Sequence, residues 1–125
     1  DAEFYAPGTF FSVLLDVTHP IAHGLPRRVS VMFERSPAFV ADEGALIGRY
    51  PRSNPLVSGW VLGQHHLQGK ASLVEIPLGL GRVILIGFKV NFRAQARGTY
   101  RLLFNSILYS SATFGENFPI NLSAE

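Results

Sequence analysis

Four histidines are the first residues in this 125-residue sequence that could do chemistry, because imidazole nitrogens bind metal ions and carry protons. His19 and His23 are four residues apart, which on a helix would place both side chains on one face. Pro20 and Gly24 oppose a continuous helix there, and the sequence contains no His-Glu-x-x-His arrangement. We therefore interpret His19 and His23 as turn residues.

A second pair, His65 and His66, is adjacent in the sequence, so on any regular element the two side chains would point in different directions. One of them could hydrogen-bond the backbone, and no third metal ligand accompanies them. We keep His65 and His66 as possible ligand or interface contacts. The only tryptophan, Trp60, is a further candidate contact.

The sequence contains no pattern that is diagnostic of nucleophilic or acid–base catalysis. The sequence has no cysteine, which excludes thiolate catalysis and cysteine-bound zinc. Ser58 follows Val57 and does not sit in a Gly-x-Ser-x-Gly turn. A set of Ser58, His65 and Asp16 can be drawn, but a triad is recognised by geometry rather than by sequence. We predict no catalytic residue, no metal ligand and no cofactor in this chain.

Two carboxylates invite structural explanations. Asp16 ends an apolar run before a turn, so we expect it to accept hydrogen bonds from backbone amides. Glu75 lies in an apolar strand, where a buried carboxylate needs a partner. We expect either a solvated strand face around Glu75 or a salt bridge from Glu75 to Arg82 across a hairpin.

The segment from Phe92 to Gly98 is the most suggestive candidate site, because it joins a predicted strand to a predicted helix. Ligands of open α/β sheets bind beyond the carboxyl ends of strands. Arg93, Gln95 and Arg97 could therefore hold an anion or a neighbouring carboxylate. The alternative, which we favour, is that they anchor the loop or pair with another domain.

The composition is that of one folded domain, with 47% apolar and 16% charged residues. The net charge is only +2 and the arginines are spread along the chain, which argues against nucleic-acid binding. Apolar runs are much shorter than the about 20 residues that a membrane span needs. The chain begins with Asp1, and we expect missing sequence upstream.

The elements that must position these residues are mostly short strands. Residues 56–63 could form a short helix or an irregular strand, and we favour a helical turn. Leu78 to Gly81 is predicted to form a hairpin turn. Val83 to Ile86 is apolar at every position, which predicts a strand buried between two layers. Strands are predicted at residues 10–16, 29–34, 45–50, 71–77 and 82–88.

A helix is predicted for residues 98–112, with Thr99 as its N-cap and a loop-like tail over residues 113–125. The apolar residues of this segment recur at helical spacing, which predicts that they form the side packed on the core. These residues are Tyr100, Leu103, Phe104, Ile107 and Leu108.

Several motifs together resemble a known family. The stretch from Lys70 to Phe88, Phe92-Arg93 and the stretch from Gly98 to Asn105 are similar to the end of a class I glutamine amidotransferase-like domain. With further motifs, the likeness covers most of residues 6–110 and extends to the C-terminal region of secreted bacterial zinc carboxypeptidases of the carboxypeptidase A type. The further motifs are Thr18-His19-Pro20, Gly24-Leu25-Pro26, Tyr50-Pro51, Asn54-Pro55 and Ser58-Gly59-Trp60.

The resemblance implies an α/β fold: a single, incomplete amidotransferase-like (flavodoxin-like) accessory domain over residues 1–125, which judged on this chain alone would be β-rich α+β with a C-terminal helix. It carries over no zinc ligand, since no histidine here stands in His-x-x-Glu, and no nucleophilic cysteine. Zinc is expected only in the catalytic domain of a parent metallopeptidase, secreted or periplasmic.

The resemblance further implies a non-catalytic role in docking, assembly or substrate access. The expected partners are missing upstream segments or the parent's catalytic domain, and a homo-oligomer is possible. Two alternatives stay open: a ligand-binding module for carbohydrate or peptide that uses Trp60, Tyr50 and the Arg93–Arg97 loop, and a hydrolase with an unrecognised site.

Overall fold

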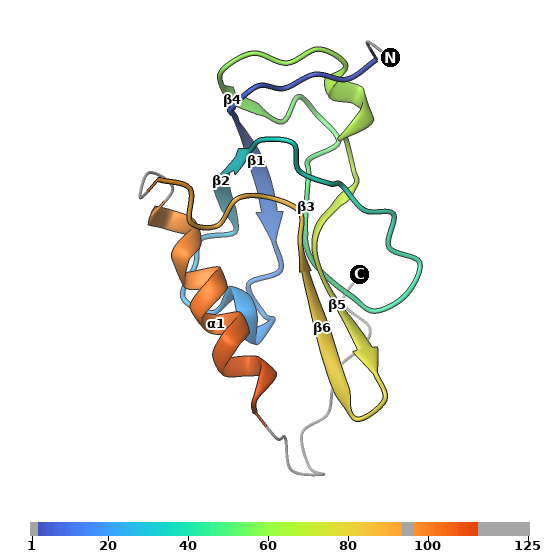
Figure 1. The fold of residues 1–125 in the computed structure, drawn as a ribbon, viewed down its shortest axis with the longest axis vertical. Helices are drawn as coiled ribbons and strands as arrows, with labels where there is room; N and C mark the ends of the chain where they lie inside the picture. Colours follow the sequence, from blue (N-terminus) through green and yellow to red (C-terminus); the bar gives the residue numbers. More distant parts are fainter. Residues whose placement is uncertain (1–2, 94–96, 113–125) are drawn as a thin grey trace.

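A computed structural model of the chain describes residues 3–93 and 97–112 (Figure 1). Its centre is a six-stranded sheet in the order β2-β1-β3-β5-β6, with β4 paired to β1. The strands are β1 (Thr9–Leu15), β2 (Arg28–Phe33), β3 (Ala45–Arg49), β4 (Leu56–Ser58), β5 (Ala71–Leu78) and β6 (Gly81–Ile86).

The helical elements are short except for the last. The 3₁₀ turns are η1 (Pro20–Ala22), η2 (Gln64–His66) and η3 (Arg97–Thr99), and η3 leads directly into the α-helix α1 (Tyr100–Ser110). Figure 1 shows α1 lying beside η1 on one side of a curled sheet. Gln95 and the predicted tail, residues 113–125, lie outside the described residues.

The sheet type refines the predicted fold class. Every strand pair in the described part of the chain is antiparallel, whereas the strands of a flavodoxin-like sheet are mainly parallel. The structure therefore supports a β-rich α+β chain with a C-terminal helix. The predicted strands at residues 10–16, 29–34, 45–50, 71–77 and 82–88 correspond to β1, β2, β3, β5 and β6.

A single cluster of buried side chains joins the sheet, η1, several loops and α1. Phe11, Phe33 and Tyr50 pack edge to face on one another, with ring centroids 5.4 to 6.4 Å apart. Leu73 from β5 and Leu102 from α1 are fully buried in the same cluster. Leu102 therefore anchors α1 in the core.

The segment around Trp60 differs from the prediction. Residues 56–58 form strand β4 rather than a helical turn, and Gly59 ends that strand with a φ of 100°. The Trp60 carbonyl accepts a 2.7 Å hydrogen bond from the Thr9 hydroxyl, so this backbone is held by β1 instead of by a helix. A glycine on either side of the short run disfavours a helix there.

The prediction that β6 is buried between two layers was wrong. β6 is the last strand of the sheet, and each of its side chains is exposed or half-buried. Val83 is 38% exposed. An apolar run shows which residues a strand contains. It cannot show whether other parts of the chain cover the two faces of that strand.

The predicted core side of the helix was also wrong. Leu102 and Ser106 are the buried residues of α1, and Phe104, Ile107 and Leu108 are 58%, 57% and 70% exposed. The helix turns Asn105 and Tyr109 toward η1 and β5 instead, where their polar groups find partners. Inward-facing polar groups thus rotate the apolar stripe toward solvent.

The start of α1 differs from the predicted cap in one respect. Thr99 occupies the N-cap position, but its side chain does not cap the helix. The hydroxyl donates a 2.8 Å hydrogen bond to the carbonyl of Val90. Thr99 therefore ties α1 to the segment that follows β6.

Candidate functional site

Four polar side chains from four elements meet beneath α1. His19 stands at the N-cap of η1, Glu75 in β5, Arg82 in β6 and Tyr109 in the last turn of α1. Glu75 and Arg82 lie diagonally across the β5–β6 hairpin, on the face that α1 covers. This polar cluster connects α1 with the start of η1 and with the β5–β6 hairpin.

Glu75 is the centre of the polar cluster. One carboxylate oxygen, Oε2, lies 2.7 Å from His19 Nε2, and the Tyr109 hydroxyl lies 3.1 and 3.2 Å from Oε1 and Oε2. Arg82 is 3.6 Å from Oε1. The predicted salt bridge between Glu75 and Arg82 is confirmed, and it explains why a carboxylate is tolerated in this apolar strand.

The contacts of His19 fix its tautomer. Nδ1 accepts a 3.1 Å hydrogen bond from the backbone N–H of Ile21, so the ring proton is on Nε2. Nε2 then donates to the Glu75 carboxylate. Both ring nitrogens are engaged, one in capping η1 and one in holding β5.

Tyr109 adds packing to its hydrogen bond. Burial raises the pKa of the Tyr109 hydroxyl above its ordinary value, as does the nearby Glu75 carboxylate, while Arg82 opposes the shift. The Arg82 guanidinium lies 4.2 Å from the Tyr109 ring centre, and the His19 ring packs on the same ring at 5.2 Å. The hydroxyl therefore stays protonated and donates to the carboxylate.

Two further contacts hold α1 on η1. Asn105 Nδ2 donates to the carbonyls of Ile21 and His23, at 2.9 and 3.1 Å. The Arg101 guanidinium packs over Gly24, which has a φ of 76° and no side chain to displace it. The chemistry available to this region is thus hydrogen bonding between elements. Neither ring nitrogen of His19 is left to act as a base.

The loop candidates lie apart from the polar cluster. Arg93 and Arg97 are exposed, and the Arg93 guanidinium lies 5.2 Å from the ring centre of Phe92. Arg93 adopts a φ of 47°, a left-handed conformation that non-glycine residues seldom take. Gln95 falls outside the described residues, so the three-residue site stays a prediction.

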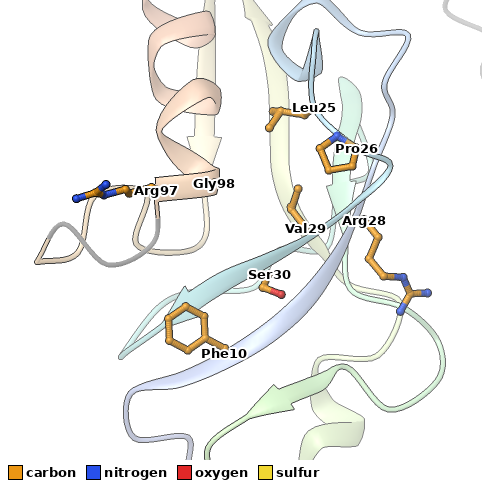
Figure 2. A pocket seen from close by; sticks show the side chains of 8 residues that line it. All are labelled: Phe10, Leu25, Pro26, Arg28, Val29, Ser30, Arg97 and Gly98. Carbon is orange, nitrogen blue, oxygen red and sulfur yellow. The ribbon is translucent and has the colours of Figure 1, made fainter.

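Arg97 borders an open hollow of about 440 Å³ between β2 and the start of η3 (Figure 2). In the figure, the side chains of Arg28 and Arg97 extend in opposite directions away from the hollow. The remaining walls are mostly apolar, so no set of polar groups converges there as ligand sites require. The lining residues are Phe10, Leu25, Pro26, Arg28, Val29, Ser30, Arg97 and Gly98.

The adjacent histidines differ from the prediction. The His65 and His66 rings lie 4.1 Å apart with 37° between their planes, so they face one another rather than diverge. The tight 3₁₀ turn η2 brings the two rings together. His65 is exposed, and His66 lines a hollow of about 290 Å³ beside Phe33 and Lys70.

The two aromatic candidates for ligand contact, Tyr50 and Trp60, differ in burial. Tyr50 is fully buried in the core, where its hydroxyl reaches the Gly87 carbonyl at 3.4 Å, so it cannot line a binding surface. Trp60 is 55% exposed and packs edge to face on Tyr5 at 6.0 Å. Trp60 thus remains a candidate contact and Tyr50 does not.

Within residues 3–93 and 97–112, no group of three His, Asp or Glu side chains is placed to hold a metal ion. In the same ranges, no helix is long and apolar enough to cross a membrane. Asp16 behaves as predicted: its carboxylate accepts hydrogen bonds from the backbone N–H of Thr18, at 3.0 Å, and from the Thr18 hydroxyl.

Sequence reasoning missed the partnership of His19 with Glu75. His19 was interpreted only as a turn residue, and Glu75 was paired only with Arg82. A carboxylate in an apolar strand was the one available signal, since 56 residues separate it from His19. Searches of protein-family models, curated proteins and solved structures found no match to this chain.

Proposed function

We propose that this chain is a non-catalytic accessory domain of a larger protein, with a role in docking, assembly or substrate access. The observation that carries this proposal is that the side chains of the polar cluster are used in hydrogen bonds within the fold. Its histidine, its carboxylate and its tyrosine are bonded to one another and to the backbone, and they hold α1, η1 and the β5–β6 hairpin together.

The edge strand β6 supports the docking part of the proposal. Gly87 N donates a hydrogen bond to Ser72 O, so the backbone of Gly87 points toward the side of β5. Because the backbone N–H and C=O groups of successive residues point alternately toward and away from the paired strand, those of Ile84 and Ile86 point away from β5. These outward groups have no partner in the described part of the chain. A free edge with apolar side chains on both faces is a ready template for a further strand.

The resemblance to the amidotransferase-like C-terminal region of bacterial zinc carboxypeptidases suggests the parent. The motifs that carry the likeness come into contact: Asn105 binds the turn after His19, and His19 binds Glu75. On this basis alone we propose a metallopeptidase parent, a secreted or periplasmic location, and that this antiparallel chain is one part of an amidotransferase-like (flavodoxin-like) domain whose parallel strands would belong to the parent. Zinc would belong to the parent's catalytic domain, and the missing upstream segments or that domain would be the partner.

One observation favours a second candidate, a ligand-binding module. Trp60 is exposed and packs on Tyr5, which is 59% exposed. Exposed aromatic rings provide faces on which sugars or peptide side chains can pack. Calorimetric titration with a panel of soluble oligosaccharides and peptides would support this candidate if binding were detected and Trp60→Ala abolished it.

A peptidase and esterase assay of the purified chain, with added zinc and with a chelator, tests the accessory role. We expect no turnover above buffer under either condition. Turnover that disappears on chelation would overturn the proposal and indicate a metallohydrolase, and turnover that survives chelation but is lost in a Ser58→Ala variant would indicate an unrecognised serine hydrolase site.

A further inference from the structure

The outer side of α1 is apolar, and no part of the chain that the structure describes covers it. Phe104, Ile107 and Leu108 are each more than half exposed, and their spacing of three and four residues places them on one stripe of the helix. We call these three residues the outer stripe. It lies opposite Leu102 and Ser106, the residues by which α1 packs on the core.

The charges around the outer stripe are unevenly distributed. Arg101 is the only charged residue of α1 and stands in its first turn, and Arg93 and Arg97 precede the helix. No acidic side chain pairs with these three arginines in the described part of the chain. The last turn of α1 has no basic residue, and the sequence that follows, residues 113–125, contains Glu116 and Glu125 but no Lys or Arg.

We propose that the outer stripe is a self-association surface, at which two copies of the chain pair through antiparallel α1 helices. In this arrangement Phe104 of one copy faces Leu108 of the other, and Ile107 lies near the two-fold axis. An isologous pair of this kind requires a self-complementary patch. This inference is independent of the proposed accessory role.

Charge complementarity selects the antiparallel pairing and the second copy as occupant. Antiparallel pairing places Arg101 beside the C-terminal end of the partner's helix, where unpaired carbonyls carry the negative end of the helix dipole. A parallel pair would instead bring the two sets of arginines together.

The side of one 11-residue helix is smaller than the about 800 Å² per partner that stable complexes bury. We therefore expect a weak dimer that dissociates on dilution. Sedimentation equilibrium of the wild-type chain up to concentrations on the order of 1 mM should show a monomer–dimer equilibrium. A strictly monomeric chain over that range would overturn the proposal.

Two variants locate the interface. Leu108→Glu should weaken dimerisation at least about tenfold, because it would bury a charge beside an apolar ring. Leu80→Glu is the matched control, since Leu80 stands fully exposed at the tip of the β5–β6 hairpin. Equal weakening by both substitutions would contradict the assignment to α1, as would no effect of Leu108→Glu.

The absence of cysteine gives a second readout. Ile107→Cys should form a disulfide-linked dimer under mild oxidation, because the two-fold axis brings the two thiols together. Leu80→Cys, equally accessible, should crosslink much more slowly. Similar crosslinking rates for the two variants would show random collision and overturn the proposal.

Discussion

His19 and Glu75 are 56 residues apart in the sequence, yet His19 Nε2 donates to Glu75 Oε2 at 2.7 Å. The opposite nitrogen of the same ring accepts the N–H of Ile21 and caps η1. One imidazole thus connects a turn to a strand, beneath the helix whose Tyr109 binds the same carboxylate. The titratable groups of this region serve the packing of the fold.

The contact between α1 and η1 can be tested through Asn105. Asn105→Ala should lower the free energy of unfolding by about 1–3 kcal/mol, because two carbonyls lose the amide that they accept. Urea denaturation measures the change. Asn91→Ala is the matched control, since the exposed Asn91 makes no such contact. Equal effects of the two substitutions would contradict the role assigned to Asn105.

Two tyrosines, the buried Tyr50 and the half-buried Tyr109, predict a loss of stability at alkaline pH. Burial raises the pKa of Tyr50 and of Tyr109 above the ordinary tyrosine value of about 10. The folded chain therefore keeps protons that the unfolded chain loses. This contribution is complete below pH about 10 and is lost as the pH rises through the folded-state pKa values.

The alkaline loss of stability should be smaller in the Tyr50→Phe and Tyr109→Phe variants, because phenylalanine has no proton to release. Urea denaturation at a series of pH values above and below 10 measures it. An identical alkaline slope in the wild type and in both variants would show that other groups cause the loss.

The buried hydroxyl of Ser72 has no hydrogen-bond partner in the described part of the chain. Ser72→Ala should therefore leave stability unchanged or raise it by about 1 kcal/mol, since an unsatisfied polar group is costly to bury. Thr9→Val provides the contrast, because the Thr9 hydroxyl donates to the Trp60 carbonyl at 2.7 Å. In thermal unfolding, Ser72→Ala should have a higher Tm than Thr9→Val. The reverse order would refute this explanation.

Gly44 lies where β3 meets the backbone of Glu75. Its φ is 87°, and a Cβ at this position would collide with the Glu75 carbonyl oxygen. Gly44→Ala should cost more stability than Gly79→Ala, because Gly79 also has a positive φ but open space around it. Chemical denaturation of the two variants gives the comparison. A larger loss for Gly79→Ala would show that strain alone, without the collision, decides the cost.

The sequence predicted five of the six strands, because alternating or continuous apolar runs bounded by Gly and Pro mark strands independently of their neighbours. It did not predict which faces are covered. The apolar pattern of α1 pointed to Phe104 and Leu108, while Asn105 and Tyr109 in fact face the molecule. Polar contacts between distant segments decided the orientation of the helix, and no local pattern reports them.

In the candidate site, too, the contact between residues near in the sequence could be predicted and the contact between distant residues could not. Arg82 stands near Glu75 in the sequence across a hairpin, so a salt bridge between them could be predicted. The contact of His19 with Glu75 depends on the order of strands in the sheet and on the position of η1. Both are set by packing of the whole chain.

A double-mutant cycle of His19 and Glu75 tests the central claim most directly. The unfolding free energies of His19→Ala, Glu75→Ala and the double variant should give a coupling energy on the order of 1 kcal/mol, since the two side chains share one hydrogen-bond network. A double variant that loses the sum of the two single losses would show no coupling. That result would contradict the claim that these groups hold the fold together.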